Sequence, residues 1–498
     1  MLFNSIQFLV FFPIVLLIYY AIPAKIKHIW LLVASYYFYM CWNARYAILI
    51  FISTVITYIS GLGIDKAQKS IDDSDKRDKM KKLIVAASFI TNLEILFYYK
   101  YYNFALSLLD KIFAGFNISF SSSRIDIILP VGISFYTFQA LSYTMDVYRG
   151  EIYAEKNFFK YALFVSFFPQ LVAGPIERSK NLLVQLSKPK KFDYFKARDG
   201  FLLMLWGYFL KIVLADRIAI FVDTVYGDFK TYGGWYLLIA TMLFAVQIYC
   251  DFAGYSTIAK GSAEFLGIDL MENFDAPYLS SSVGEFWRKW HISLTSWFKD
   301  YLYIPLGGSR KGKIRKHINK LIVFMVSGLW HGANITFVIW GSLNGIYQII
   351  GETLMPLRQK FVKKMHLNVQ SIGHKLARCF ITFVLIDFSW IFFRAGNCYD
   401  AFEIIKSIFC CNNIWILFDG SLYDCGLDSK NFCLMVISIM VLFLTDIAKK
   451  KGIVLREIIL KQDYWFKCLI LIFVICFILI FGIWGSGYDS AGFIYFQF

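Results

Sequence analysis

FKCLILIFVICFILIFGIW, residues 466–484, holds a single charged residue in 19 positions. An α-helix needs about 20 mainly apolar residues to cross a bilayer, so this run predicts a transmembrane helix. Other long apolar runs recur along the chain, among them residues 8–22, 46–64 and 432–444. The 498 residues are 58% hydrophobic and only 17% charged, against about 25% charged residues in a soluble domain. The sequence therefore predicts an all-α polytopic membrane protein and excludes a soluble fold.

The formal net charge of +16 comes from Lys and Arg residues that lie mainly in short segments between the apolar runs. Basic segments are typical of the cytoplasmic side of a membrane protein, where they attract anionic lipid headgroups. We therefore predict that residues 65–82 and 307–320 lie in the cytoplasm and that the N-terminus lies outside. Because the lipid bilayer accounts for the charge, we expect no nucleic-acid partner.

One apolar stretch, residues 158–183, is interrupted by Pro169, Gly174 and Pro175. Broken backbone at membrane depth is tolerated where protein or a cavity covers it, so this stretch predicts a re-entrant segment. Residues 1–498 contain no linker long enough to separate two domains, and we predict a single integral-membrane domain. The ten cysteines are scattered without metal-ligand spacing, so we expect no metal site and no bound cofactor.

The stretch WRKWHISLTSWF, residues 287–298, places basic residues and a histidine among tryptophans. Trp287, Trp290 and His291 recur at helical spacing, which predicts one continuous helix with these side chains on a shared face. A basic, aromatic helix of this kind is often an interfacial helix in the headgroup region. That interpretation explains the tryptophans and leaves His291 without a structural reason.

His331 lies in an uncharged apolar stretch, residues 321–347. An ionisable residue within a span is a functional-site hypothesis, and a neutral imidazole can take and return a proton near pH 7. The alternative is a histidine that forms a structural hydrogen bond between helices. Gly328 and Gly332 predict a close approach of neighbouring backbones. Ser327 and Asn334, at i−4 and i+3, are expected to share the helix face of His331.

Five motifs together resemble the membrane-bound O-acyltransferases, in particular the bacterial branch typified by the alginate O-acetylation membrane protein. The first two are WRKWHISLTSWFKDYLYIPLGGSR and GLWHGANITFVIWG, and the signature region as a whole extends over about residues 130–350. The other three are PVGISFYTFQALSYTMDVYRG (130–150), FFPQLVAGPIER (167–178) and DFAGYSTIAKGSAEFLGI (251–268). The resemblance is strong over residues 1–350 and general over the C-terminal runs.

This resemblance implies a fold of roughly 11 or more transmembrane helices in a ring around a thinned centre, with a tunnel and with re-entrant or interfacial helices. It implies that His331 and His291 are the catalytic residues. The expected substrate-binding residues are Trp287, Arg288, Trp290, Ser327, Trp330 and Asn334. Of these, Trp330 and Asn334 are candidates to stabilise the oxyanion. The 310–320 basic segment would attract coenzyme A phosphates.

The expected reaction is transfer of an acyl group, most simply acetyl, from acetyl-CoA or another cytoplasmic thioester. The expected acceptor is an extracellular or cell-wall polysaccharide, reached with a separate extracellular partner that bears a hydrolase-like fold. The expected location is the plasma or inner membrane. Two alternatives stay open: D-alanyl or other acyl transfer to teichoic acid, a lipid or a protein, and, in another class, a transporter, which also places polar residues in broken helices.

Overall fold

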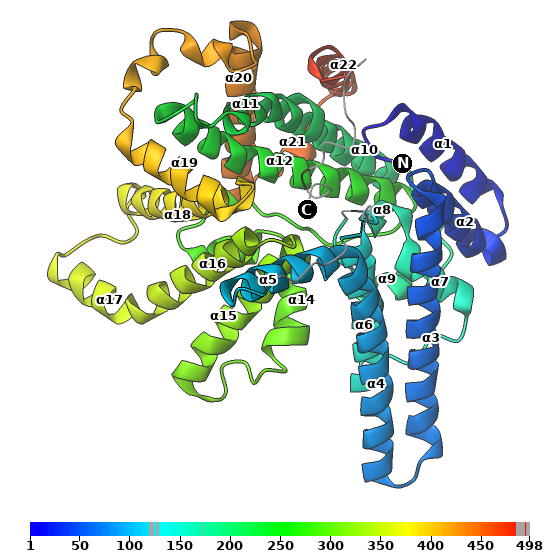
Figure 1. Ribbon diagram of the computed structural model, residues 1–498. Helices are drawn as coiled ribbons and strands as arrows, with labels where there is room; N and C mark the ends of the chain where they lie inside the picture. The colour runs from blue at the N-terminus through cyan, green and yellow to red at the C-terminus, as the bar shows by residue number, and fades with distance from the viewer. Residues whose placement is uncertain (119–123, 126–128, 173, 485–493, 495–498) are drawn as a thin grey trace. The chain divides into compact units, whose positions relative to one another are not determined.

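Helix is the regular secondary structure of the part that the computed structural model of the chain describes, which is residues 1–118, 124–125, 129–172, 174–484 and 494 (Figure 1). These residues group into two units. The N-terminal unit is Met1–Phe201 with Ala259–Met271, and the C-terminal unit is Leu202–Ile258 with Glu272–Phe498. Two helices, α10 (Tyr194–Tyr208) and α12 (Trp235–Phe265), contribute residues to both units.

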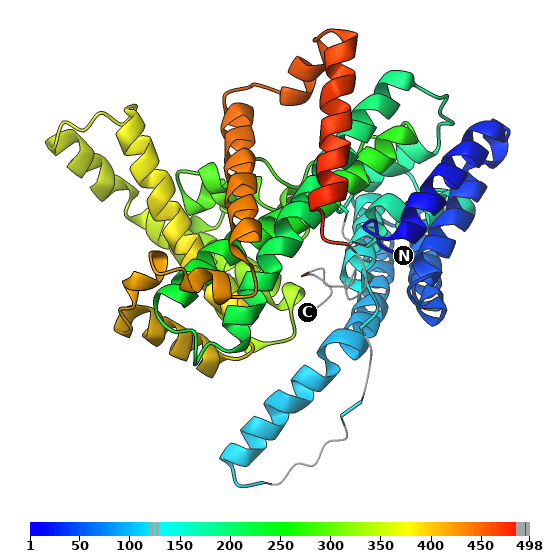
Figure 2. The same ribbon diagram turned by 90° about the horizontal axis from the view of Figure 1, so that it is seen from above.

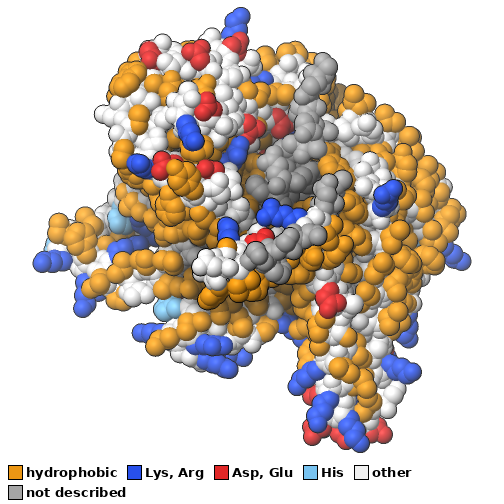
Figure 3. Space-filling model, in the orientation of Figure 1, with side chains coloured by type: hydrophobic (Ala, Val, Ile, Leu, Met, Phe, Trp, Pro, Cys, Tyr) orange, Lys and Arg blue, Asp and Glu red, His pale blue; other side chains and the backbone are white. Residues whose placement is uncertain are grey.

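The N-terminal unit is built from nine α-helices. They are α1 (Ile6–Ala21), α2 (Lys27–Met40), α3 (Ala47–Ser70), α4 (Ser74–Leu96), α5 (Tyr102–Gly115), α6 (Ile133–Arg149), α7 (Phe158–Ser166), α8 (Phe168–Leu171) and α9 (Ser179–Leu186). Helices α3 and α4 form a long hairpin whose tip carries both Lys and Asp side chains (Figure 3). A π-helical turn, Phe97–Tyr101, separates α4 from α5, and α5 leaves in another direction (Figure 2). Such turns commonly bend helices.

Polar side chains link the helices of this unit. Ser53 of α3 donates a hydrogen bond to the side chain of Asn92 in α4 at 2.6 Å. Tyr161 of α7 donates to Thr57 of α3 at 2.7 Å. Gly61 of α3 lies so close to the Tyr143 ring that a Cβ there would be 2.7 Å from a ring carbon. Small and hydroxylated residues at such contacts are typical of helix packing in membranes.

The C-terminal unit contains the π-helical segment η4 and, besides its part of α10 and α12, the later α-helices. They are η4 (Phe209–Ala215, π-helical), α11 (Asp216–Gly227), α13 (Val283–Lys289), α14 (Ile292–Phe298), α15 (Gly312–His331), α16 (Ile335–Thr353), α17 (Met355–Lys364), α18 (Ile372–Arg394), α19 (Cys398–Cys410), α20 (Ser429–Lys450), α21 (Leu455–Leu460) and α22 (Tyr464–Phe481). Lys211 in η4 forms buried ion pairs with Asp251 of α12 at 2.6 Å and with Asp216 at 2.9 Å. Because buried charges are costly unless paired, this contact explains how a Lys and an Asp are accommodated inside apolar helices.

Among the described residues, five helical stretches are long and apolar enough to cross a membrane: Ala44–Ser70, Trp235–Phe265, Ile372–Arg394, Ser429–Lys450 and Tyr464–Phe481. Shorter apolar helices such as α1 accompany them. These helices confirm the predicted all-α polytopic class. The interruption predicted for residues 158–183 is also confirmed, because that stretch folds as the three short helices α7, α8 and α9.

Candidate active site

His291 lies at a break between two short helices. The spacing of residues 287–298 predicted one continuous helix, and this prediction was wrong. Helix α13 ends at Lys289, Trp290 is extended, and His291 adopts φ 44° and ψ 54°, which is the left-handed region. A residue with a Cβ rarely adopts this conformation unless its surroundings impose it, and such residues concentrate at functional sites. The histidine thus sits at a corner of the backbone and not on a helix face.

Asn273 accounts for the break. Its backbone carbonyl accepts a hydrogen bond from the N–H of Ile292 at 2.9 Å, and its side-chain oxygen accepts one from the hydroxyl of Ser293 at 2.6 Å. Its amide nitrogen donates to the hydroxyl of Ser256 in α12 at 2.9 Å. These bonds fix the residues that follow His291 to a distant segment, so a long-range contact overrides the local helical pattern.

His331 is the last residue of α15. The apolar stretch 321–347 was expected to carry this histidine inside one helix, and that prediction was wrong as well. Helix α15 ends at His331, Gly332 is extended, and Asn334 caps the start of α16 by accepting a hydrogen bond from the N–H of Thr336 at 3.2 Å. His331 therefore lies at the turn of a helical hairpin.

The predicted close backbone approach is confirmed at Gly328, whereas a Cβ on Gly332 would meet the side-chain ring of Phe337 at 2.1 Å. A Cβ on Gly328 would lie 2.2 Å from the carbonyl oxygen of Phe337, and a Cβ on Gly341 would lie 2.2 Å from that of Phe324. Residues near the end of α15 thus face the start of α16, and earlier residues of α15 face later residues of α16. The two helices are antiparallel, and the glycines allow their backbones to touch.

The C-terminal unit brings the two histidines together. Their ring centroids lie 6.3 Å apart, and the exposed fractions of the two residues are 0% for His291 and 4% for His331. Trp330 contacts both rings, at 5.9 Å from His291 and 5.0 Å from His331. Two imidazoles at this separation can act on one small acyl group held between them.

Aromatic rings surround the histidine pair. His291 lies 4.6 Å from the ring of Phe252, and His331 lies 5.0 Å from Trp340 and 5.6 Å from Phe393. Such an enclosure excludes water, and hydrogen bonds and charges act more strongly there than in solvent. Helices α13 and α14 lie outside the five candidate spans, and burial lowers the pKa of the His291 imidazole to about 3. His291 is therefore uncharged at neutral pH.

Three of the other predicted binding residues, Trp287, Ser327 and Trp290, are buried. Trp287 lies 5.6 Å from Trp340 and donates a hydrogen bond to Asn344 at 3.0 Å, so it belongs to the wall around His331. Ser327 is buried one turn before His331 in α15. Trp290 is buried against other aromatic rings, stacking on Phe286 at 5.3 Å.

Arg288 and Asn334 lie apart from this buried group. Arg288 is exposed, whereas its neighbour Trp287 is buried. Asn334 lies in the turn after α15 and not on its face, because the helix has ended. Its amide nitrogen donates to the carbonyl of Gly396 at 3.0 Å while its oxygen caps α16. Both ends of this side chain thus form hydrogen bonds, and the second N–H of its amide leaves Asn334 a candidate oxyanion donor.

Comparison with known proteins decides the family. The model of MBOAT, the membrane-bound O-acyltransferase family, matches residues 151–386. The probable alginate O-acetylase AlgI of Pseudomonas aeruginosa is 35% identical over 412 residues, covering 82% of this chain and 75% of that protein. The peptidoglycan O-acetyltransferase of Helicobacter pylori is 32% identical over 449 residues, covering 83% and 81%. The chain belongs to the membrane-bound O-acyltransferase family.

Membership of this family confirms that the protein is a membrane O-acyltransferase. The teichoic acid D-alanyltransferase of Bacillus subtilis is a further relative, 25% identical over 281 residues, which cover 53% of this chain and 68% of that protein. Among the residues that the structure describes, there is no group of three or more His, Cys, Asp or Glu side chains that could hold a metal ion.

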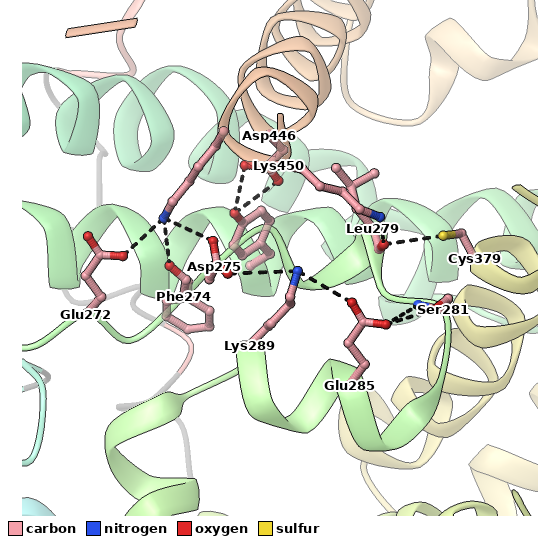
Figure 4. A network of polar contacts seen from close by, with 12 residues as sticks. Glu272, Phe274, Asp275, Leu279, Ser281, Glu285, Lys289, Cys379, Asp446 and Lys450 are labelled. Carbon is pink, nitrogen blue, oxygen red and sulfur yellow. Dashed lines mark hydrogen bonds and ion pairs between the residues drawn. The ribbon is translucent and has the colours of Figure 1, made fainter. Parts of the chain in front are cut away.

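A polar network holds α13 in place in this O-acyltransferase (Figure 4). Lys289 lies 3.8 Å from Asp275 and 3.6 Å from Glu285, and Lys449 of α20 lies 3.5 Å from Asp275. Burial by itself would raise the pKa of Glu285, but the Ser281 hydrogen bonds and Lys289 outweigh it and lower the pKa below its usual value. Lys289 thus anchors the helix that precedes His291.

Sequence reasoning missed Asn273 and Asp275. Both lie in the non-helical segment ENFDA, residues 272–276, which has no periodicity. An asparagine and an aspartate next to buried aromatic residues were the available signal, since buried polar groups need partners. The partner that each selects lies on another element, and only the folded chain reveals it.

Proposed function

We propose that this O-acyltransferase moves an acetyl group from a cytoplasmic thioester, such as acetyl-CoA, to a hydroxyl group of an extracellular or cell-wall polysaccharide. The observation that carries the proposal is the pair of buried imidazoles, 6.3 Å apart within aromatic walls. Two relatives with extensive coverage are named for O-acetyl transfer, one to alginate and one to peptidoglycan. The plasma or inner membrane is the proposed location, because donor and acceptor lie on opposite sides of it.

In the proposed reaction, His331 takes the proton of the acceptor hydroxyl while the oxygen of that hydroxyl attacks the thioester carbonyl. The C–S bond then breaks, the ester forms, and the thiolate leaves with a proton returned from His331. His291 positions the acyl group, and the indole N–H of Trp330, whose ring contacts both imidazoles, is the candidate donor to the oxyanion. Holding donor and acceptor in one enclosure makes the reaction effectively unimolecular.

The basic segment of residues 310–320 supports a cytoplasmic thioester that carries phosphate groups. Most of this segment is the first part of α15 rather than a loop. Lys316 and Lys320 form ion pairs with Glu352 at 2.7 and 2.5 Å, and hydrogen bonding to Glu352 raises the pKa of Lys316. Arg310, Lys311, Lys313 and Arg315 are exposed. These four cations can attract the phosphates of coenzyme A.

D-alanyl transfer from a carrier protein is the second candidate, and the teichoic acid relative is the observation in its favour. Its lower identity and coverage make acetyl transfer the better supported function. The proposal includes a separate extracellular partner with a hydrolase-like fold that helps the acetyl group to reach the polymer.

Mass spectrometry of cell-surface polymers from strains with and without this chain tests the function. We expect O-acetyl groups to disappear when the chain is removed and to return on complementation. Loss of D-alanyl esters in place of O-acetyl groups would replace the first candidate with the second. Inside-out membrane vesicles supplied with labelled acetyl-CoA distinguish acetyl-CoA from a carrier protein as the donor. Free coenzyme A thiol is released only if acetyl-CoA is the donor.

A further inference from the structure

The N-terminal unit contains a cavity that is separate from the histidine pair. It is an open hollow between the α1–α2 connection and the segment that follows α9, with about 340 Å³ of empty space when the adjoining solvent is counted. The residues that line it are Tyr19, Ala24, Lys27, His28, Leu31, Gln185, Leu186, Ser187, Lys188, Pro189, Lys190 and Ile268. Four of these described lining residues are basic, and none is an Asp or a Glu.

Lys27 is held in the cavity wall without a carboxylate partner among the lining residues. Its ammonium group donates a hydrogen bond to the carbonyl of Lys190 at 2.9 Å and lies over the ring of Tyr19 at 4.6 Å and of Tyr20 at 5.1 Å. Tyr20 is fixed in turn by a hydrogen bond to the carbonyl of Phe265 at 2.6 Å. These neutral partners orient the ammonium group and leave its positive charge uncompensated.

Two lysines with more freedom complete the basic rim. Lys188 is exposed and Lys190 is half-buried, and the stem of Lys190 packs close to the backbone of Gly267. Gln185 is occupied by hydrogen bonds with the backbone of Asp269, at 2.9 Å each way. The polar groups offered to a ligand are therefore mainly cationic donors, which suit an anion with several oxygen atoms.

We propose that this cavity binds the phosphate group of an anionic phospholipid, with Lys27, Lys188 and Lys190 facing the headgroup. Basic pockets between membrane helices recognise such headgroups, and tyrosines are enriched at the same depth. Helix α1, whose last turn supplies Tyr19 and Tyr20, exposes Val10, Ile14 and Leu17 along its length. This apolar surface gives the acyl chains of a lipid a place to lie, which a free phosphate would not use.

The test compares lipid binding by the full chain and by the variant Lys188→Gln/Lys190→Gln. Glutamine keeps the side-chain stem that packs near Gly267, and the carbonyl bond to Lys27 is unaffected because it comes from the backbone. The matched control is Lys363→Gln/Lys364→Gln, which removes two exposed charges from α17. Native mass spectrometry in detergent would measure retention of phosphatidylglycerol and of phosphatidylcholine with the same acyl chains.

We expect phosphatidylglycerol to be retained in preference to phosphatidylcholine and the cavity variant to bind it about 30-fold more weakly, since each lysine near an anionic headgroup contributes about fivefold. The control variant should bind like the parent, and added salt should weaken binding. Equal retention by the cavity variant and the control, or equal retention of the two lipids, overturns the proposal.

Inorganic phosphate distinguishes the two sources of the anion. We expect phosphatidylglycerol to raise the unfolding temperature of the parent more than inorganic phosphate does, with the difference absent in the cavity variant. If inorganic phosphate alone gives the full increase and the cavity variant loses it, the site takes a soluble phosphate and the lipid assignment is wrong. The unfolding temperature of each variant without ligand verifies that it folds. Acyl transfer is not part of these measurements, so the result is independent of the proposed function.

Discussion

Replacement of His331 by glutamine is the sharpest test of the proposed chemistry. Glutamine has a similar volume and keeps hydrogen-bonding groups, but it cannot act as a base near pH 7. The imidazole contacts Trp330, Trp340 and Phe393 at centroid distances of 5.0, 5.0 and 5.6 Å. Loss of these ring contacts is a packing change within a large helical unit, so the protein should still insert and fold.

The magnitudes of the two effects differ enough to be separated. General base catalysis contributes about 10²–10⁴-fold, so His331→Gln should reduce acyl transfer by at least about 100-fold. An aromatic pair contributes about 0.5–1.5 kcal/mol beyond its buried area, and the three closest pairs, with Trp330, Trp340 and Phe393, are affected. The expected loss of stability is therefore only about 1–3 kcal/mol, given that the glutamine fills part of the space.

The assay is the O-acetyl content of cell-surface polymer at matched protein level, together with thermal unfolding of each purified variant. Phe393→Leu is the packing control, because it disturbs the same wall from α18 without removing an imidazole. It should lose stability and retain much of the activity. His291→Ala should impair transfer severely, and the double variant should be no worse than His331→Gln alone, because both imidazoles serve one acyl group. Near-normal acylation in His331→Gln would leave this histidine a structural residue.

Three further predictions concern the framework of the site. Asn273→Ala removes hydrogen bonds to Ser293 and Ser256. It should destabilise the chain by about 2–4 kcal/mol in thermal unfolding and lower acyl transfer as measured by polymer analysis. Unchanged activity would mean that the backbone corner at His291 does not depend on Asn273. Gly341→Ala places a Cβ 2.2 Å from a backbone oxygen and should cost about 1–3 kcal/mol in thermal unfolding, whereas Gly351→Ala in the same helix meets nothing within 4 Å and serves as its control. A cysteine at the exposed Ser309, introduced after the native cysteines are replaced, should resist impermeant thiol reagents in sealed cells, and labelling from outside would contradict the cytoplasmic placement of residues 307–320.

The membrane class followed from the sequence because it rests on local chemistry, and the prediction that His291 and His331 are the site residues rests on local chemistry as well. Long apolar runs need no tertiary information to predict a membrane helix, and an imidazole in such surroundings is conspicuous by itself. The glycine prediction also succeeded, since a residue without a Cβ is informative wherever two backbones meet. What those glycines contact, however, is the other arm of the same hairpin, which the sequence did not predict.

Neither helix break was predicted, and the reason differs between the two: the cause is a distant segment at His291 and a concealed local signal at His331. At His291, the residues before and after the histidine do form helices, as the spacing of the tryptophans predicts. The backbone corner between them is imposed by Asn273, which lies 18 residues earlier in the chain. At His331, the signal was local: a glycine followed two residues later by an asparagine that can cap a helix. The apolar residues on both sides of that turn concealed it, since both arms of the hairpin continue the same hydrophobic pattern.

These breaks give the two histidines unequal electrostatic settings. His331 closes α15, a helix of 20 residues, where the carbonyl groups of the last turn favour positive charge. His291 occupies the position before the first residue of α14, where the N–H groups disfavour positive charge. A proton taken from an acceptor hydroxyl is therefore better held on His331 than on His291. This asymmetry supports His331 as the base and His291 as the neutral partner that positions the acyl group, and it arises only because each histidine lies at a helix end.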